Sequence, residues 1–409
     1  MGEADKKEAN LPRLKLTLRP TAESIVRSGH PWVYSDSIRK QSREGEAGEV
    51  AVIYDRKDKF LALGFFDPDS PLRVRILHVG KPVQLNDAWW QAKLEETLDR
   101  RSGILSEETN GLRLINGESD GWPGLVMDRY DSTLVLKLYT PAWVGLINSL
   151  VPMMVGAIAP ERIVLRMSRN LQAWVSANGG QKDGEILHGP PLDGVVTFLE
   201  NGLLFESDVI RGQKTGFFLD QRENRQRVGE LSKGLDVLNA FSFSGGFSLY
   251  AARGGARSVT DLDISAHALE AAKRNFALNE EDPMVAACVY RSVQDDAFKW
   301  IESGKPSSFD LVIVDPPSLA KREAERERAV QAYGKLNSNA IRLLRRGGIL
   351  VAASCSGHVS EVEFFDAVRS AARKSGRAFQ EIETRLHAPD HRATFPEAQY
   401  LKCFYLKFS

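Results

Sequence analysis

Two side chains in the C-terminal half of the sequence are of the types that a nucleophile and its acidic partner require. Cys355 stands in Ala353-Ser354-Cys355-Ser356-Gly357, directly after an apolar run, and Asp315 begins Asp315-Pro316-Pro317 after another. A thiol reacts as a nucleophile near neutral pH only where its surroundings favour the thiolate. A lone cysteine at a strand end is more often a small buried hydrophobe, so the interpretation depends on what surrounds it.

Together, Cys355 and Asp315 suit methylation of a pyrimidine ring at carbon C5. That carbon is too weak a nucleophile to attack a methyl donor directly, but addition of a thiolate to C6 turns the ring into an enamine whose C5 can attack. Asp315 would hold the edge of the base and stabilise charge that develops on the ring. A base inside a duplex would first have to be flipped out of the stack.

Acidic residues follow successive apolar runs, which is the pattern of a cofactor site. The first run leads into Ser242-Phe243-Ser244-Gly245-Gly246, the second ends at Asp263, 17 residues beyond Gly246, and the third precedes Asp295-Asp296. Each acid alone is more often a helix cap, but the series fits an adenosine ligand, with ribose hydroxyls at Asp263 and the adenine amine at Asp296. Because the turn lacks the G-x-G-x-x-G spacing of diphosphate sites, NAD is disfavoured and S-adenosylmethionine is the predicted cofactor.

The elements that carry these residues alternate between strand and helix from Gly234 onward, which predicts an α/β fold with an open, largely parallel sheet and helices on both faces. The expected strands are Leu235–Phe241, Ser258–Asp263, Val285–Arg291, Phe309–Val314, Gly348–Ser354, Phe379–Leu386 and Tyr400–Phe408. The expected helices are Gly246–Arg253, Ala266–Asn279, Asp295–Ser303, Arg322–Arg345 and Ser360–Lys374.

The N-terminal half has a different pattern. Residues 13–80 hold short β-type runs between turn residues and predict a small β-barrel, while residues 81–190 mix helix and strand patterns and predict an α+β central domain. The Gly- and Pro-rich stretch Asn178–Pro191 is expected to be a linker, and Val195–Ser207 a hairpin that turns at Asn201-Gly202. We therefore expect the domains to be 13–80, 81–190 and 191–409, after a disordered leader over residues 1–12.

Composition narrows the class of protein. The 409 residues include 43% hydrophobic and 26% charged residues, with no apolar run long enough to span a membrane and no secretory signal. Three widely spaced cysteines predict neither a disulfide framework nor a metal site, which favours a reducing cytoplasm. A net charge of zero disfavours indiscriminate nucleic-acid binding, but residues 321–346 carry +5 and residues 211–230 carry +2 beside the chemical motifs. Such runs are about as often plain solvated helix faces.

Several motifs together resemble one family, the bacterial 23S ribosomal RNA (cytosine-C5)-methyltransferase I family. The resemblance rests on the Asn239–Gly246 turn and the Asp315 and Cys355 motifs, and it covers nearly the whole chain from about residue 13. The other matching segments are Lys214–Arg222, Phe395-Pro396-Glu397, Tyr400-Leu401-Lys402, Gly29–Tyr34, which looks like the family's RNA-binding PUA domain, and Ile115–Gly124, which looks like its middle domain.

The resemblance implies a role for each matching residue. It implies that Cys355 is the nucleophile and Asp315 its partner, that the protein forms a homodimer, and that its substrate is ribosomal RNA of the 23S type, free or in an assembling subunit. The implied cofactor contacts are Gln221, Phe241, Ser242, Ser244, Gly245, Gly246, Asp263, Ile264, Asp296 and Asp315. The basic and aromatic residues at the expected RNA entrance are Lys214, Arg222, Lys321, Arg322, Tyr333 and Lys335.

Departures from the family pattern keep other functions open. Gly334 follows Tyr333 where a basic residue is common, Arg392 follows His391 where a proline is common, and no second cysteine stands near Asp315 to help release a covalent adduct. One alternative is methylation of another base atom, such as guanine N7, with Cys355 uninvolved. Amino methylation is disfavoured because Ser318, not an aromatic residue, follows the prolines. The alternative from another class is a non-catalytic RNA-binding assembly factor.

Overall fold

The computed structural model describes residues 13–409, and the predicted leader lies outside them. The chain divides into two compact units. Among the described residues, unit 1 comprises residues 13–106, 111–196 and 208–217, and unit 2 comprises residues 107–110, 197–207 and 218–409. This division differs from the expected boundary at residue 191, because residues 208–217 belong with unit 1 and the hairpin before them belongs with unit 2.

Unit 1 contains two sheets. The first has six strands in the order β2-β6-β5-β4-β1-β3, and the second has five in the order β11-β10-β9-β8-β7. The strands of the first sheet and the helices between them in the sequence are β1 (Lys15–Leu18), α2 (Pro20–Arg27), β2 (Trp32–Tyr34), η1 (Ser35–Ser37), β3 (Ile38–Gln41), β4 (Val50–Tyr54), β5 (Phe60–Phe66) and β6 (Leu72–Val79). Those of the second are α3 (Asp87–Asp99), β7 (Gly111–Asn116), η2 (Gly117–Asp120), β8 (Leu125–Tyr130), β9 (Thr133–Leu138), η3 (Pro141–Trp143), α4 (Ile147–Ile158), β10 (Arg162–Met167), α5 (Arg169–Asn178) and β11 (Ile186–His188).

Unit 2 is built on a seven-stranded sheet preceded by a two-stranded hairpin. Its strands are β12 (Val196–Glu200), β13 (Leu203–Ser207), β14 (Asp236–Ala240), β15 (Ser258–Asp263), β16 (Val289–Gln294), β17 (Phe309–Val314), β18 (Leu344–Ser354), β19 (Phe379–Arg385) and β20 (Lys402–Phe408). Its helices are η4 (Leu219–Gln221), α6 (Arg222–Leu231), α7 (Gly246–Arg253), α8 (Ala266–Ala277), α9 (Pro283–Ala287), α10 (Ala297–Ser303), η5 (Glu323–Glu325), α11 (Arg326–Leu343), α12 (Glu361–Lys374) and η6 (Pro396–Ala398).

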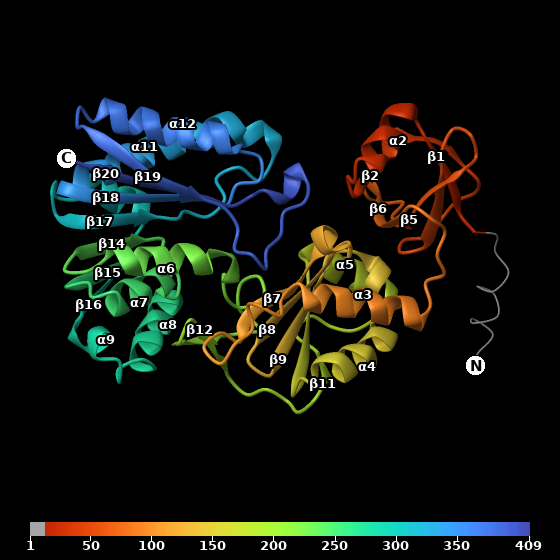
Figure 1. Cartoon of the computed structure of the whole chain (residues 1–409), viewed down its shortest axis with the longest axis horizontal. Coiled ribbons are helices and arrows are strands. Elements are labelled where there is room, and N and C mark those ends of the chain that lie inside the picture. The colour runs from red at the N-terminus through yellow and green to blue at the C-terminus, as the bar shows by residue number, and fades with distance from the viewer. Residues whose placement is uncertain (1–12) are drawn as a thin grey trace. The chain divides into compact units, whose positions relative to one another are not determined.

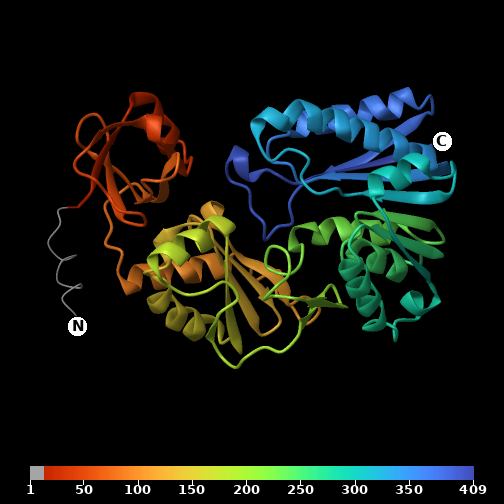
Figure 2. The same cartoon turned by 180° about the vertical axis from the view of Figure 1, so that it is seen from behind.

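The seven-stranded sheet has the order β16-β15-β14-β17-β18-β20-β19, with only β20 running against its neighbours. Leu238, Val312 and Leu350 point to the face covered by α10, α11 and α12, whereas Val237 and Ile313 point to the face covered by α6 and α7. Figure 1 and Figure 2 show these two helical layers on opposite sides of the sheet. Burial on both faces explains why the strands are continuous apolar runs. The strand order reverses between β14 and β17, and such a reversal is where an open parallel sheet binds its ligand.

Most of the predicted elements are confirmed, and the exceptions have local causes. The segment predicted as strand Val285–Arg291 begins as helix α9, because Asp282 caps the Met284 and Val285 amides and Pro283 occupies the first helical position. The predicted linker Asn178–Pro191 contains β11, which pairs with β10. The hairpin is confirmed, with positive φ at both turn residues, 49° at Asn201 and 78° at Gly202.

No helix among residues 13–409 has the length and apolar character to cross a membrane. Within the same residues, no group of three or more His, Cys, Asp or Glu side chains is arranged to hold a metal ion.

Candidate active site

The fold brings Cys355 and Asp315 together. Strands β17 and β18 are parallel neighbours, with Val314 opposite Ala352, so the residues that follow them leave the same edge of the sheet. The Cys355 thiol donates a weak hydrogen bond to the carbonyl of Pro316, at 3.9 Å. The side chains of Cys355 and Asp315 are both partly exposed. The expected adjacency of the two strands is therefore confirmed.

The serines on either side of Cys355 fix its loop. The Ser356 hydroxyl accepts from the amide of Leu319, 3.0 Å away, and so joins the cysteine loop to the loop after Asp315. It also lies 2.8 Å from the hydroxyl of Tyr333 on α11, to which the Ser354 hydroxyl donates at 2.9 Å. Ser354 and Ser356 are fully buried. These contacts restrict the position of the thiol, which is what a nucleophile needs for an aligned attack.

Asp315 is held by two linked side-chain amides, one from η4 and one from α6. Gln221 Nε2 donates to Asp315 Oδ2 at 2.9 Å, and Asn224 Nδ2 donates to Gln221 Oε1 at 2.6 Å. Gln221 and Asn224 are 4% and 0% exposed, so the two amides orient the Asp315 carboxylate from within the protein. Asn224 was not predicted from the sequence, although it stands one helical turn after Gln221, a spacing that brings side chains together.

The turn after β14 is shaped to approach a ligand closely. Phe241 and Phe243 have positive φ, 61° and 48°, a strained conformation for such residues that is typical of binding sites. The hydroxyls of Ser242 and Ser244 in the same turn are buried without a hydrogen-bond partner. Buried hydroxyls seldom lack partners, so these two fit the polar groups of a bound ligand, such as the amino-acid end of S-adenosylmethionine.

Gly245 is required by this turn for two reasons. Its φ is +74°, and a Cβ there would lie 2.8 Å from Ala272 Cβ and 2.9 Å from Asp261 Oδ2. We expect G245A to lower the free energy of unfolding by about 1–3 kcal/mol more than G376A and to weaken cofactor binding. Gly376 is the matched control, because its φ is +69° but its Cβ would meet nothing within 4 Å. Equal losses of stability in urea unfolding would contradict this account of the turn.

Asp263 and Asp296 lie at the ends of β15 and β16, as predicted. Both carboxylate oxygens of Asp263 already accept a hydrogen bond within the protein. Its Oδ2 accepts from the amide of Phe243 and its Oδ1 from that of Ser265, both at 2.9 Å. Asp296 caps α10 through the amides of Phe298 and Lys299. Ile264, also predicted to contact the cofactor, is 69% exposed. Contact between Ile264 and the cofactor stays a prediction.

Asp261 was not predicted as a site residue from the sequence, and its carboxylate stabilises the turn after β14. It is fully buried and accepts from Asn239, Ser248 and Tyr290. Burial is the main cause that raises the pKa of its carboxyl to about 7, against the hydrogen bonds that lower it.

The raised pKa of Asp261 makes stability depend on pH. An unfolded aspartate has a pKa of about 3.9, so the folded protein binds the extra proton between about pH 4 and 7 and loses this stabilisation as the pH rises through 7. We expect the free energy of unfolding of the wild type, relative to D261N, to fall by a few kcal/mol from pH 5 to pH 8. Urea unfolding at the two pH values measures it, and a constant difference would contradict the assignment.

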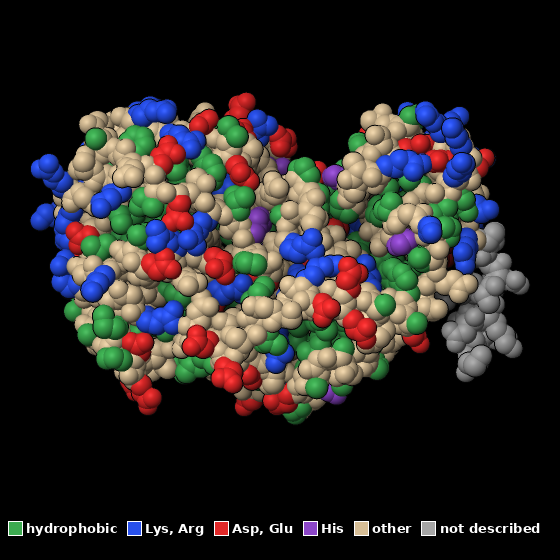
Figure 3. Space-filling model, viewed as in Figure 1, with side chains coloured by type: hydrophobic (Ala, Val, Ile, Leu, Met, Phe, Trp, Pro, Cys, Tyr) green, Lys and Arg blue, Asp and Glu red, His purple; other side chains and the backbone are tan. Residues whose placement is uncertain are grey.

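The residues predicted to contact RNA fall into two groups. Lys321, Arg322 and Lys335 are exposed in unit 2, and Lys214 is exposed in unit 1. Lys335 also pairs with Glu302 at 2.8 Å. For these four residues RNA contact stays a prediction. On the face shown in Figure 3, basic and acidic side chains are interspersed over unit 2, in keeping with the net charge of zero.

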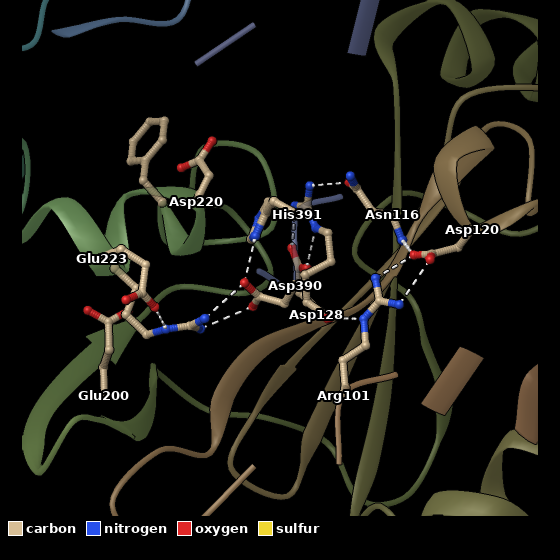
Figure 4. Close-up of polar contacts among 12 residues, drawn as sticks. Arg101, Asn116, Asp120, Asp128, Glu200, Asp220, Glu223, Asp390 and His391 are labelled. Atoms are coloured by element: carbon tan, nitrogen blue, oxygen red, sulfur yellow. Dashed lines mark hydrogen bonds and ion pairs between the residues drawn. The ribbon is translucent and has the colours of Figure 1, made fainter. Parts of the chain in front are cut away.

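Arg222 and Tyr333 need correction, because both are buried. Arg222 is 2% exposed and makes a bidentate ion pair with Asp390, whose neighbour His391 also contacts that carboxylate; Figure 4 shows Asp390 and His391 side by side. Tyr333 is fully buried beneath the Cys355 loop, and burial raises the pKa of its hydroxyl. Neither side chain is at the surface, so both organise the protein and do not meet RNA directly.

Two motifs in unit 1 also have structural roles. The buried Asp120 carboxylate accepts from Arg101 and from the amide of Asn116, and Figure 4 shows this cluster at the end of β7. In the segment that begins at Lys214, the Thr215 hydroxyl donates to Asp128 at 2.6 Å. These buried polar contacts explain why the segment Ile115–Gly124 and the segment that begins at Lys214 contain so many polar residues.

Comparisons with known proteins agree with this architecture. A family model of S-adenosylmethionine-dependent methyltransferases matches residues 174–403, and one of PUA-like domains matches residues 16–78. The crystal structure of a protein described as a methyltransferase, complexed with SAH, has a TM-score of 0.81 at 21% identity and covers 96% of this chain and 99% of its own. The family models and this likeness together confirm the fold class: a PUA-like N-terminal domain and an α/β methyltransferase domain at the C-terminus.

Relatives of higher identity span the whole chain. A ribosomal RNA large subunit methyltransferase of Deinococcus radiodurans is 55% identical over 406 residues, which are 98% of this chain and 98% of that protein. Ribosomal RNA large subunit methyltransferase I of Vibrio vulnificus is 33% identical over 390 residues, or 94% of this chain and 96% of that protein. The chain therefore belongs to the ribosomal RNA large subunit methyltransferase I family, and its cofactor is S-adenosylmethionine.

Proposed function

We propose that this protein methylates carbon C5 of a cytosine in large-subunit ribosomal RNA through a temporary covalent bond between Cys355 and C6 of the base. The observation that carries the proposal is the contact between the loop after β17, which begins at Asp315, and the loop after β18, which begins at Cys355. Ser356 joins the two loops, and they lie next to the strand-order reversal between β14 and β17. The names of the relatives support ribosomal RNA as the substrate.

The reaction can be written from the residues of this chain. The Cys355 thiolate adds to C6, which places electron density on C5, and Asp315 holds the edge of the base and stabilises the charge that develops on the ring. When bound, S-adenosylmethionine would supply an electrophilic methyl group, and the bond from that methyl group to the sulfonium sulfur would break so that S-adenosylhomocysteine leaves. After C5 has taken that methyl group, a base removes the C5 proton, the electron pair of the C5–H bond re-forms the ring double bond, and Cys355 leaves as a thiolate.

Methylation of another atom, such as guanine N7, is the main alternative. It needs no thiol, so the ordered loop around Cys355 would then have no chemical purpose. The fixed position of the thiol beside Pro316 favours the covalent route. The homodimer stays a prediction from the resemblance, and the cytoplasmic location stays a prediction from the three widely spaced cysteines.

The product of the reaction tests the proposal. Unmodified large-subunit ribosomal RNA, free or in subunits, is incubated with the protein and S-adenosylmethionine, and its nucleosides are then analysed by mass spectrometry and by bisulfite sequencing. We expect 5-methylcytidine at one position that becomes protected from bisulfite. A methylated purine without a protected cytosine would overturn the proposal, and no methylated nucleoside from either substrate would favour an RNA-binding factor.

A further inference from the structure

A lysine beneath the Cys355 loop is fully buried. Lys402, the first residue of β20, is 0% exposed and lies opposite Ser354 in the antiparallel β18–β20 pair. Its ammonium donates to the carbonyl of Ser356 at 2.7 Å and to that of Val359 at 2.5 Å, so both of these contacts go to the loop that begins at Cys355.

The ammonium of Lys402 has no carboxylate partner among residues 13–409. Within these residues its ammonium donates to the two carbonyls, and a buried charge is costly without an opposite charge. Three groups whose negative charge favours the charged form of Lys402, and so raises its pKa, are Cys355 and, on α12, Glu361 and Glu363. Burial lowers the pKa of Lys402 to about 8, with Cys355 acting in the opposite direction, so the lysine still carries its charge at neutral pH.

We propose that Lys402 is a positioning residue for Cys355: it anchors the loop that carries the thiol and provides the positive charge beside which the thiolate forms. The inference rests on the proposed function, because it assigns to the same nucleophile its source of activation. A thiol needs a nearby base or cation to be nucleophilic near neutral pH, and Lys402 meets that need from inside the protein.

The other groups around the loop do not replace this charge. Asp315, Glu361 and Glu363 are acids, which oppose formation of a thiolate, and burial keeps the Tyr333 hydroxyl neutral by raising its pKa. His358 belongs to the loop itself but lies 3.5 Å from Glu323 at the surface. Five titratable groups thus belong to the elements around the Cys355 loop, and Lys402 is the basic one among them. They are Asp315 after β17, Tyr333 on α11, Glu361 and Glu363 on α12, and Lys402 on β20.

Thiol alkylation tests the proposal without any RNA. The rate of iodoacetamide modification of Cys355, followed by mass spectrometry of its peptide, is measured against pH in the full chain. The other two cysteines report little in this range, because burial raises the pKa of Cys288 to about 11 and that of Cys403 to about 12. We expect the wild-type midpoint to lie clearly below the ordinary thiol value of about 8.5.

Replacing the lysine should remove the effect. We expect K402M to raise the midpoint by at least about one pH unit and to slow alkylation at pH 7 about tenfold. K407M is the matched control, because Lys407 lies on the same strand but is exposed, and it should leave the profile unchanged. A K402M profile that superimposes on the wild type overturns the proposal. If K402M does not fold, the wild-type midpoint alone decides, and a value of 8.5 or above overturns it.

The outcomes separate this inference from the proposed function. If C355S retains full methylation activity, the covalent mechanism fails whatever the titration shows. If C355S is inactive but the K402M titration is unchanged, the mechanism stands and the role of Lys402 fails.

Discussion

C355A is expected to lose methylation activity by at least about a thousandfold while binding S-adenosylmethionine as tightly as the wild type. The loss is large because removal of the thiol removes the route through C6 altogether and leaves a C5 atom that is too weak a nucleophile. Binding should not change, because the cofactor turn after β14 comes from other residues than the cysteine loop. Single-turnover transfer of a labelled methyl group to RNA measures the rate, and titration calorimetry measures the binding.

C288S is the matched control for C355A. Cys288 is also partly buried, but it lies between α9 and β16 and contributes to neither loop of the site. We expect C288S to keep wild-type activity. Activity of C355A within a fewfold of the wild type would refute a covalent mechanism, even if the RNA were still methylated at cytosine.

D263A is expected to weaken the binding of S-adenosylmethionine about a hundredfold. A carboxylate that accepts from ligand hydroxyls is worth about 1.5–3 kcal/mol, and the loss of its contacts to the amides of Phe243 and Ser265 would also loosen the cofactor turn. Titration calorimetry with the cofactor alone measures the change, so the result does not depend on the identity of the RNA.

D282A is the control for the loss of a carboxylate that accepts from backbone amides, as distinct from the loss of a carboxylate that contacts the cofactor. Asp282 also accepts from two backbone amides, those of Met284 and Val285, but it caps α9 and not the turn after β14. We expect D282A to lower stability slightly and to leave cofactor binding unchanged. If D263A binds the cofactor as the wild type does, Asp263 is not part of the cofactor site.

The residues of the site that could be predicted from the sequence are those that stand at or just after the end of a strand. Asp263, Asp296, Asp315 and Cys355 each follow an apolar run, and a parallel sheet necessarily brings such positions to one edge. Asp315 and Cys355 directly follow neighbouring parallel strands, β17 and β18, as expected. The cofactor could be inferred in the same way, because the turn after β14 lacks the spacing of diphosphate sites.

The parts that could not be predicted depend on tertiary contacts. Lys402 and Lys407 point to opposite faces of β20, and because both faces carry apolar residues, the pattern does not show that only Lys402 is buried. Arg222 was expected at an RNA surface because it stands in a basic segment, but its partner Asp390 is 168 residues away in the sequence. The helix α9 interrupts an apolar stretch that suits a strand equally well, and its capping by Asp282 decides the outcome.

The most direct test of the account is a covalent trap at Cys355. In RNA whose target cytosine carries fluorine at C5, methyl transfer can occur but the C5 substituent cannot leave as a proton, so the bond between Cys355 and C6 should persist. We predict a denaturation-resistant protein–RNA complex that forms only with S-adenosylmethionine, maps to the peptide containing Cys355 and is absent in C355A. Continued methylation of ordinary RNA by C355A, with no trapped complex from the wild type, would contradict the account.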